Sequence, residues 1–177
     1  MVEDTKMLEE ETPKEEKATK EVEKPVPTPP LEVAARRLDR LLSEKLDFYT
    51  DPVKAVRRWL GTSATEISAD DIRAAASILL DPNGPSSVAR ALLVAGYTDD
   101  ASMETEEAKP FLSLSSTREV ETWLLSLAVR LLWREQKFAE AFELAQKGID
   151  ISLAHIENSS ASSLFPILAR LFRWRSL

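Results

Sequence analysis

Apolar residues recur at helical spacing along most of the chain from residue 31 onward. The clearest series is Val120, Trp123, Leu124, Leu127, Ala128, Leu131 and Leu132. Intervals of three and four residues place such side chains on one face of a helix. A second series starts at Phe138 after a short charged turn. The pattern therefore predicts two helices between Glu119 and Ile149 that form a hairpin.

The two apolar series define the core expected for this hairpin. Small residues at 141, 145 and 148 allow the two backbones to approach closely, and Gly148 costs about 1 kcal/mol relative to alanine inside a helix. A packing constraint is the expected compensation. The predicted core consists of Trp123, Leu127, Leu131, Phe138, Ala141, Phe142, Ala145 and Ile149.

Helical spacing and turn signals predict five further helices. They cover residues 31–49, 52–60, 69–80 and 88–95, and a stretch from Leu164 to the C-terminus. Asp51 before Pro52 is a typical N-cap, and the Ser68 hydroxyl is placed to accept the amide hydrogen of Asp71. Gly61 and Gly96 are expected to close the second and fourth helices.

Two segments have no sustained period. Residues 1–30 alternate Glu and Lys and become proline-rich, so we expect a disordered acidic tail. Residues 98–117 are expected to form an acidic flexible loop between helical sections over 31–97 and 118–177. The turn formers at 81–85 lack the Lys-Ser/Thr pair of a phosphate-binding loop. The expected fold is all-α, with antiparallel helical hairpins in a tetratricopeptide-like right-handed repeat array.

Charge and composition restrict the classes of partner. The formal net charge is -7, whereas phosphate binding is driven by Lys and Arg, so we expect no nucleic-acid partner. The chain has no cysteine, which excludes disulfides and thiolate metal sites. Its N-terminus resembles neither a secretory signal nor a mitochondrial presequence, and no apolar stretch is long enough to span a bilayer. A protein partner is expected, without a membrane or a cofactor.

Candidate catalytic groups are few. His155 is the only histidine, so it is the only available imidazole base, and its place late in a helix favours a packed structural role. Acidic residues such as Glu119, Glu121 and Glu143 lie near Arg and Lys on helix faces, where surface ion pairs are a sufficient explanation. A small helical enzyme therefore remains only a third hypothesis.

The last helix ends in an apolar and basic sequence. Phe172, Arg173 and Trp174 come close to the end of the chain without a glycine stop, and such an apolar helix needs a partner. We expect these three residues to form an interface. The tryptophans could instead stack on bases, but the acidic balance favours protein packing.

The hairpin shares part of the tetratricopeptide pattern. Phe138, Ala141 and Gly148 match the spacing of that motif around its second helix, whereas Ala145 stands where the motif prefers an aromatic residue. Ala128 and Val129 replace its Leu-Gly pair. The hairpin is tetratricopeptide-like and degenerate.

The order of segments supports a more specific resemblance. An acidic loop with Met103-Glu104-Thr105-Glu106 precedes a proline, then Glu119-Val120-Glu121, an apolar helix and Gln136-Lys137-Phe138-Ala139-Glu140-Ala141. This order resembles the non-ATPase regulatory subunit 3 family of the 26S proteasome lid. Pro110 lies further upstream than the proline of that family. The resemblance is best over residues 119–172 and weaker over 31–95.

The resemblance implies a non-catalytic scaffold of the regulatory particle lid in the cytoplasm and nucleus. Such a subunit supports ubiquitin-dependent protein degradation through contacts with other lid subunits. Family members also carry a C-terminal PCI domain, which is not expected within these 177 residues. The chain would therefore correspond to the N-terminal part only. The alternative is an unrelated tetratricopeptide-like adaptor that binds a peptide or a partner helix.

Overall fold

A computed structural model describes residues 30–43, 51–62, 67–95, 112–159 and 161–177, and every regular element in these ranges is helical. The all-α prediction is therefore confirmed for this part of the chain. The predicted tail, the acidic part of the predicted loop, Gly96 and the end of the first helix at Tyr49 lie outside the described residues. The elements are α1 (Pro30–Ser43), α2 (Pro52–Thr62), α3 (Ala69–Leu79), α4 (Ser87–Ala95), α5 (Thr117–Arg134), α6 (Phe138–Ser159), a 3-10 turn η1 (Ser162–Leu164) and α7 (Phe165–Arg175).

Local hydrogen bonds explain several helix starts. The Asp51 carboxylate accepts the amide hydrogen of Val53 at 3.0 Å, so the expected cap of α2 is present. Ser68 and Asp71 form a full capping box, in which the Asp71 amide donates to Ser68 Oγ at 3.1 Å and the Ser68 amide donates to Asp71 Oδ2 at 3.0 Å. Gly61 does not stop α2, which continues to Thr62.

The capping box at Ser68 gives a testable contribution to stability. Ser68→Ala is expected to lower the free energy of unfolding by about 1 kcal/mol near neutral pH. The bonds from Ser68 hold the pKa of Asp71 below its ordinary value, so this contribution is present above the aspartate pKa of the unfolded chain and is lost as pH falls through the lowered value. Urea unfolding at neutral and acidic pH measures both effects. Ser77→Ala, which removes only a bond to the Ala74 carbonyl, is the control.

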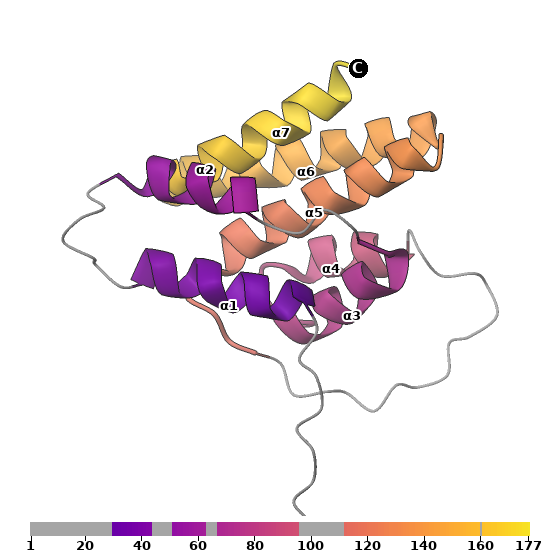
Figure 1. The fold of residues 1–177 in the computed structure, drawn as a ribbon. Coiled ribbons are helices and arrows are strands. Elements are labelled where there is room, and N and C mark those ends of the chain that lie inside the picture. The colour runs from indigo at the N-terminus through magenta and orange to yellow at the C-terminus, as the bar shows by residue number, and fades with distance from the viewer. Residues whose placement is uncertain (1–29, 44–50, 63–66, 96–111, 160) are drawn as a thin grey trace, which may run out of the picture.

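Helix α5 lies at the centre of the helical assembly (Figure 1). It contacts α1, α3, α4, α6 and α7. Its side chains are buried almost all the way round from Val120 to Val129. Trp123 is fully buried, and its ring meets that of Trp59 edge to face at a centroid distance of 4.9 Å. The predicted surface position of Glu121 is wrong, because this residue lies in the interior.

The turn between α5 and α6 ends α5 without a glycine. The Lys137 amide donates to the Leu132 carbonyl at 3.0 Å, and the Gln136 amide donates to the Trp133 carbonyl at 3.1 Å. This pair of bonds forms a Schellman motif, which requires a left-handed residue after the helix. Gln136 has that conformation, with φ of 62°. The motif brings the start of α6 back along α5.

The core of α6 differs in part from the prediction. Ala141, Ala145 and Ile149 are buried, as are Trp123, Leu127 and Leu131 on α5. Phe138 and Phe142 are 50% and 49% exposed, so their assignment to the core is wrong. A β-carbon placed on Gly148 would lie 3.2 Å from Leu171 and 3.5 Å from Leu125. Small residues face the neighbouring helices because α5 and α7 approach α6 closely, and the phenylalanines are left at the rim.

Helix α7 forms an outer edge of the helical assembly (Figure 1). It packs against α2, α5 and α6, with Ile167, Leu168 and Leu171 buried. Pro166 lies in its first turn, where a missing amide hydrogen costs no helical bond. The Arg170 guanidinium donates to the Leu60 carbonyl at 3.0 Å, which joins α7 to the end of α2.

Candidate functional site

Glu121 is a fully buried carboxylate at the meeting point of α4, α5 and α6. Its Oε2 atom accepts a hydrogen bond from Ser86 Oγ at 2.8 Å and lies 3.2 Å from His155 Nε2. Its Oε1 atom is buried and has no hydrogen-bond partner among the described residues. The site therefore joins α5, α6 and the turn before α4 through one carboxylate oxygen.

The environment of Glu121 disfavours its charged form. Burial raises the pKa of the Glu121 carboxyl above its ordinary value, against opposing effects of Ser86, His155 and Arg118. An ionised carboxylate can only accept hydrogen bonds, so Nε2 of His155 must then carry a proton.

The order of these groups differs from that of a catalytic triad. In a triad the imidazole lies between the hydroxyl and the carboxylate, so that it can accept the proton of the nucleophile. Here the carboxylate lies between Ser86 and His155, and both bond to the same oxygen. Ser86 is also buried. The arrangement suits a structural polar cluster.

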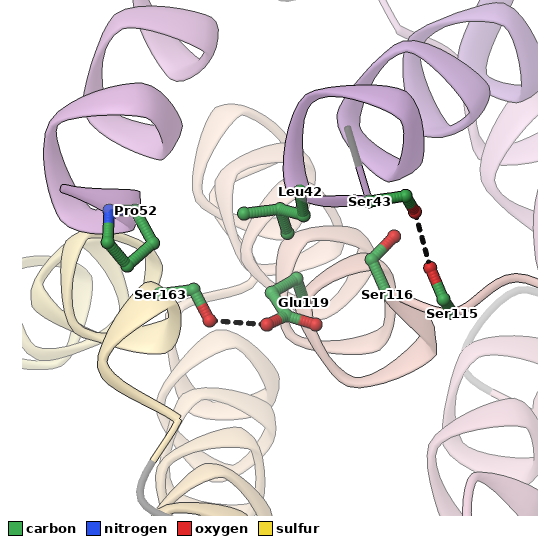
Figure 2. A pocket seen from close by; sticks show the side chains of 7 residues that line it. All are labelled: Leu42, Ser43, Pro52, Ser115, Ser116, Glu119 and Ser163. Carbon is green, nitrogen blue, oxygen red and sulfur yellow. Dashed lines mark hydrogen bonds between the residues drawn. The ribbon is translucent and has the colours of Figure 1, made fainter. Parts of the chain in front are cut away.

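A pocket of about 450 Å³ opens where α1, α2, the start of α5 and η1 meet (Figure 2). Ser163 Oγ donates a short hydrogen bond to Glu119 Oε1, and the hydroxyls of Ser43 and Ser115 lie 2.7 Å apart. Ser115 Oγ also donates to Asp39 at 2.7 Å. The lining residues are Leu42, Ser43, Pro52, Ser115, Ser116, Glu119 and Ser163.

The chemistry of this pocket is that of hydroxyls and one carboxylate. No histidine, lysine or arginine is among its described lining residues. The Ser115 hydroxyl and the Ser116 amide both donate to the Asp39 carboxylate. Burial of Asp39 acts to raise its pKa, but these hydrogen bonds together outweigh burial and hold the pKa below its ordinary value. The serines thus fasten α1 to the start of α5. Nothing in the lining supplies an activated nucleophile.

A third candidate is the outer surface of α6 and α7. Among the described residues, five large apolar side chains on these two helices are exposed. We name this set the α6/α7 stripe, and it consists of Phe138, Phe142, Leu153, Phe165 and Phe172. Trp133 packs against Phe138 with ring centroids 4.6 Å apart, and against Trp174 at 6.1 Å. The stripe therefore borders a tryptophan pair.

The predicted interface residues lie at this surface. Phe172 and Arg173 are exposed, whereas Trp174 is half-buried and its carbonyl accepts the indole hydrogen of Trp133 at 3.1 Å. Sequence reasoning missed Phe138 and Phe142 as surface residues. It also placed Glu121 on the surface. The signal for its burial was its position inside the most apolar helix. The interface itself stays a prediction.

Comparisons with known proteins were negative: the chain matches no family model, no curated protein and no solved structure. Within the described ranges, no group of three His, Asp or Glu side chains is placed to hold a metal ion. Of the helices described, none is long and apolar enough to cross a bilayer. A functional proposal therefore depends on the residues and surfaces of this chain.

Proposed function

We propose that this chain is a non-catalytic scaffold that presents helix faces to other proteins. The observation that carries the proposal is the α6/α7 stripe, in which large apolar side chains are exposed on two neighbouring helices. Contiguous apolar surface on a protein commonly marks a binding site for another protein. The net charge of -7 favours a protein partner over nucleic acid.

The finer form of the proposal is a tetratricopeptide-like repeat. In this arrangement α5 and α6 are one hairpin, and α7 is the first helix of the next. Repeat units bury one face within the hairpin and another against a neighbour. The stripe lies on α6 and α7, where a further helix of a right-handed array would pack.

The most specific form is membership of the 26S proteasome lid. The support is the order of motifs from Met103 to Ala141, which resembles the non-ATPase regulatory subunit 3 family. As the N-terminal part of such a subunit, the chain would contact other lid subunits in the cytoplasm and nucleus. It would support ubiquitin-dependent degradation by regulating the assembled enzyme, without a cofactor or catalytic residues of its own.

Affinity purification tests lid membership. Tagged chain isolated from its own cells is expected to recover lid subunits in fixed proportion, measured by quantitative mass spectrometry. Phe142→Ser combined with Phe172→Ser is expected to reduce this recovery, because a central apolar anchor contributes about 2 kcal/mol or more and its loss weakens binding about thirtyfold.

The matched control for this purification is Val33→Ser, since Val33 is similarly exposed but lies on α1. It is expected to recover lid subunits as the unchanged chain does. If the unchanged chain is expressed and folded yet recovers no proteasome subunit, lid membership is wrong.

An unrelated tetratricopeptide-like adaptor is the second candidate. Trp123 and Trp133 favour it, because lid family members carry other large apolar residues at the corresponding positions. Such an adaptor would use the same exposed surface for a peptide or a partner helix. Recovery of one unrelated protein in fixed proportion, dependent on Phe142 and Phe172, would support the adaptor function.

A further inference from the structure

The α6/α7 stripe lies on two helices that pack against each other, and we name the surface line between its two halves the groove. Arg175 lies one turn after Phe172 on the same side of α7, because residues three apart are neighbours on a helix. The Arg175 guanidinium lies 5.6 Å from the centre of the Phe142 ring on α6. The exposed Phe142 and Phe172 therefore lie on the same side of the helix pair, and the Arg175 side chain lies against the first of them.

On each helix, three consecutive residues pass from the buried face to the exposed face. On α6, Ala141 is buried, Phe142 is half-exposed and Glu143 is exposed. On α7, Leu171 is buried, and the exposed Phe172 and Arg173 follow it. The end of α7 lies beside the start of α6, so the two helices are antiparallel. In antiparallel helices the same order of residues places the charged side chains on opposite outer sides of the helix pair. The apolar groove thus has Glu143 on one outer border and Arg173 on the other.

The border on α6 carries three acidic residues, with the exposed Lys147 between the first two. Glu143, Asp150 and Glu157 are exposed and recur every seven residues. Each follows an apolar residue of the groove side, and a seven-residue interval keeps side chains on one line of a helix. Gln146 donates to Asp150 at 2.7 Å and leaves the charge of this border unchanged.

The border on α7 carries Arg173, whereas Arg170 donates to the Leu60 carbonyl of α2 and Arg175 lies against the Phe142 ring. This helix carries Arg170, Arg173 and Arg175 and no acidic residue. Burial lowers the pKa of Arg170, and the positive charges of Arg130 and Arg173 lower it further. Positive charge is therefore in excess around α7, although the whole chain is acidic. A partner that brings negative charge to this border would relieve the repulsion.

We propose that the α6/α7 stripe binds an amphipathic helix of a partner protein, with basic residues bordering its apolar face over α6 and acidic residues bordering it over α7. This inference rests on the proposed scaffold function and names the chemistry of the partner. A helix that lies in an apolar groove uses anchors three, four and seven residues apart. The phenylalanines provide the contact area, and the two charged borders select the partner.

Binding of designed helical peptides to the full chain tests the groove. Two cross-linked peptides of about 18 residues, or five turns, share one apolar face. The mixed peptide has one acidic and one basic border, and the basic peptide has two basic borders. Circular dichroism verifies that both are helical, and fluorescence anisotropy measures binding. The unchanged chain is expected to bind the mixed peptide about fivefold more tightly, as one exposed ion pair contributes up to about 1 kcal/mol.

Substitutions in the chain separate the apolar and the electrostatic contributions to peptide binding. Arg173→Glu is expected to reduce the preference for the mixed peptide, because it replaces an exposed positive charge of the α7 border with a negative one. Phe172→Ser is expected to weaken both peptides about thirtyfold, while Val33→Ser leaves binding unchanged. Far-UV circular dichroism checks that each variant keeps its helices.

Several results would contradict the proposal that a partner helix binds in the groove. It is wrong if neither helical peptide binds, if Phe172→Ser leaves their binding unchanged, or if Arg173→Glu does not alter the preference. Sedimentation that detects a dimer of this chain, lost in Phe172→Ser, would assign the stripe to a second copy and also reject the proposal. Recovery of lid subunits without peptide binding would reject the groove alone. Peptide binding without lid subunits would reject lid membership alone.

Discussion

Trp123→Ala is expected to lower the free energy of unfolding by about 3–5 kcal/mol, the usual range for removing a buried tryptophan from a core. The Trp123 side chain is fully buried on α5 and contacts the Trp59 ring of α2 edge to face. Its loss leaves a cavity at the centre of the helical assembly. Domains of ordinary size have a total stability of about 5–15 kcal/mol, so the variant is expected to lose a large part of its stability. Urea unfolding followed by far-UV circular dichroism measures the change.

Two substitutions control for the Trp123 result. Trp123→Phe keeps an aromatic ring and removes an indole N–H that is buried without a partner among the described residues, so its cost is expected to be smaller. Phe142→Ala removes a half-exposed ring and is expected to cost about 1 kcal/mol. A loss for Trp123→Ala no greater than that for Phe142→Ala would contradict the central position of α5.

The helices of this chain are predictable from the sequence because local signals mark them. The spacing of apolar residues predicts all seven helical segments, and Ser68 and Asp51 identify two helix starts by their capping chemistry. The end of α5 is harder to locate, since its Schellman motif uses Gln136 where glycine is usual. Local chemistry is therefore sufficient for the elements and for the starts of α2 and α3.

The errors arise where packing decides the outcome. A helix is expected to have one buried face, but α5 is enclosed by neighbours, so the charged Glu121 is buried with the apolar residues. On α6 the large side chains are expected to mark the core. The close approach of α5 and α7 buries the small residues Ala141, Ala145 and Gly148, as expected, but leaves Phe142 at the rim. These outcomes depend on the distances between helices, which spacing along one helix does not contain.

The same enclosure makes His155 important for stability. His155→Ala is expected to lower the free energy of unfolding by about 1–3 kcal/mol near neutral pH, because it leaves the buried Glu121 carboxyl without its imidazole partner. Burial already raises the pKa of Glu121, and loss of His155 removes an interaction that favours the ionised form. A carboxyl with a raised pKa in the folded state contributes stability below the unfolded pKa and loses it as pH rises through the folded value.

The cost of His155→Ala is therefore expected to depend on pH. Near the ordinary glutamate pKa of about 4.3, the raised pKa of Glu121 favours its protonated form in the folded chain, so the loss is expected to be smaller. Glu121→Gln in the same chain removes the charge and is expected to recover most of the loss at neutral pH. Glu143→Gln, which neutralises an exposed carboxylate on α6, is expected to recover none. Urea unfolding of the four proteins at both pH values makes the comparison. An equal loss at both pH values, with no recovery by Glu121→Gln, would show that His155 stabilises the fold through other contacts.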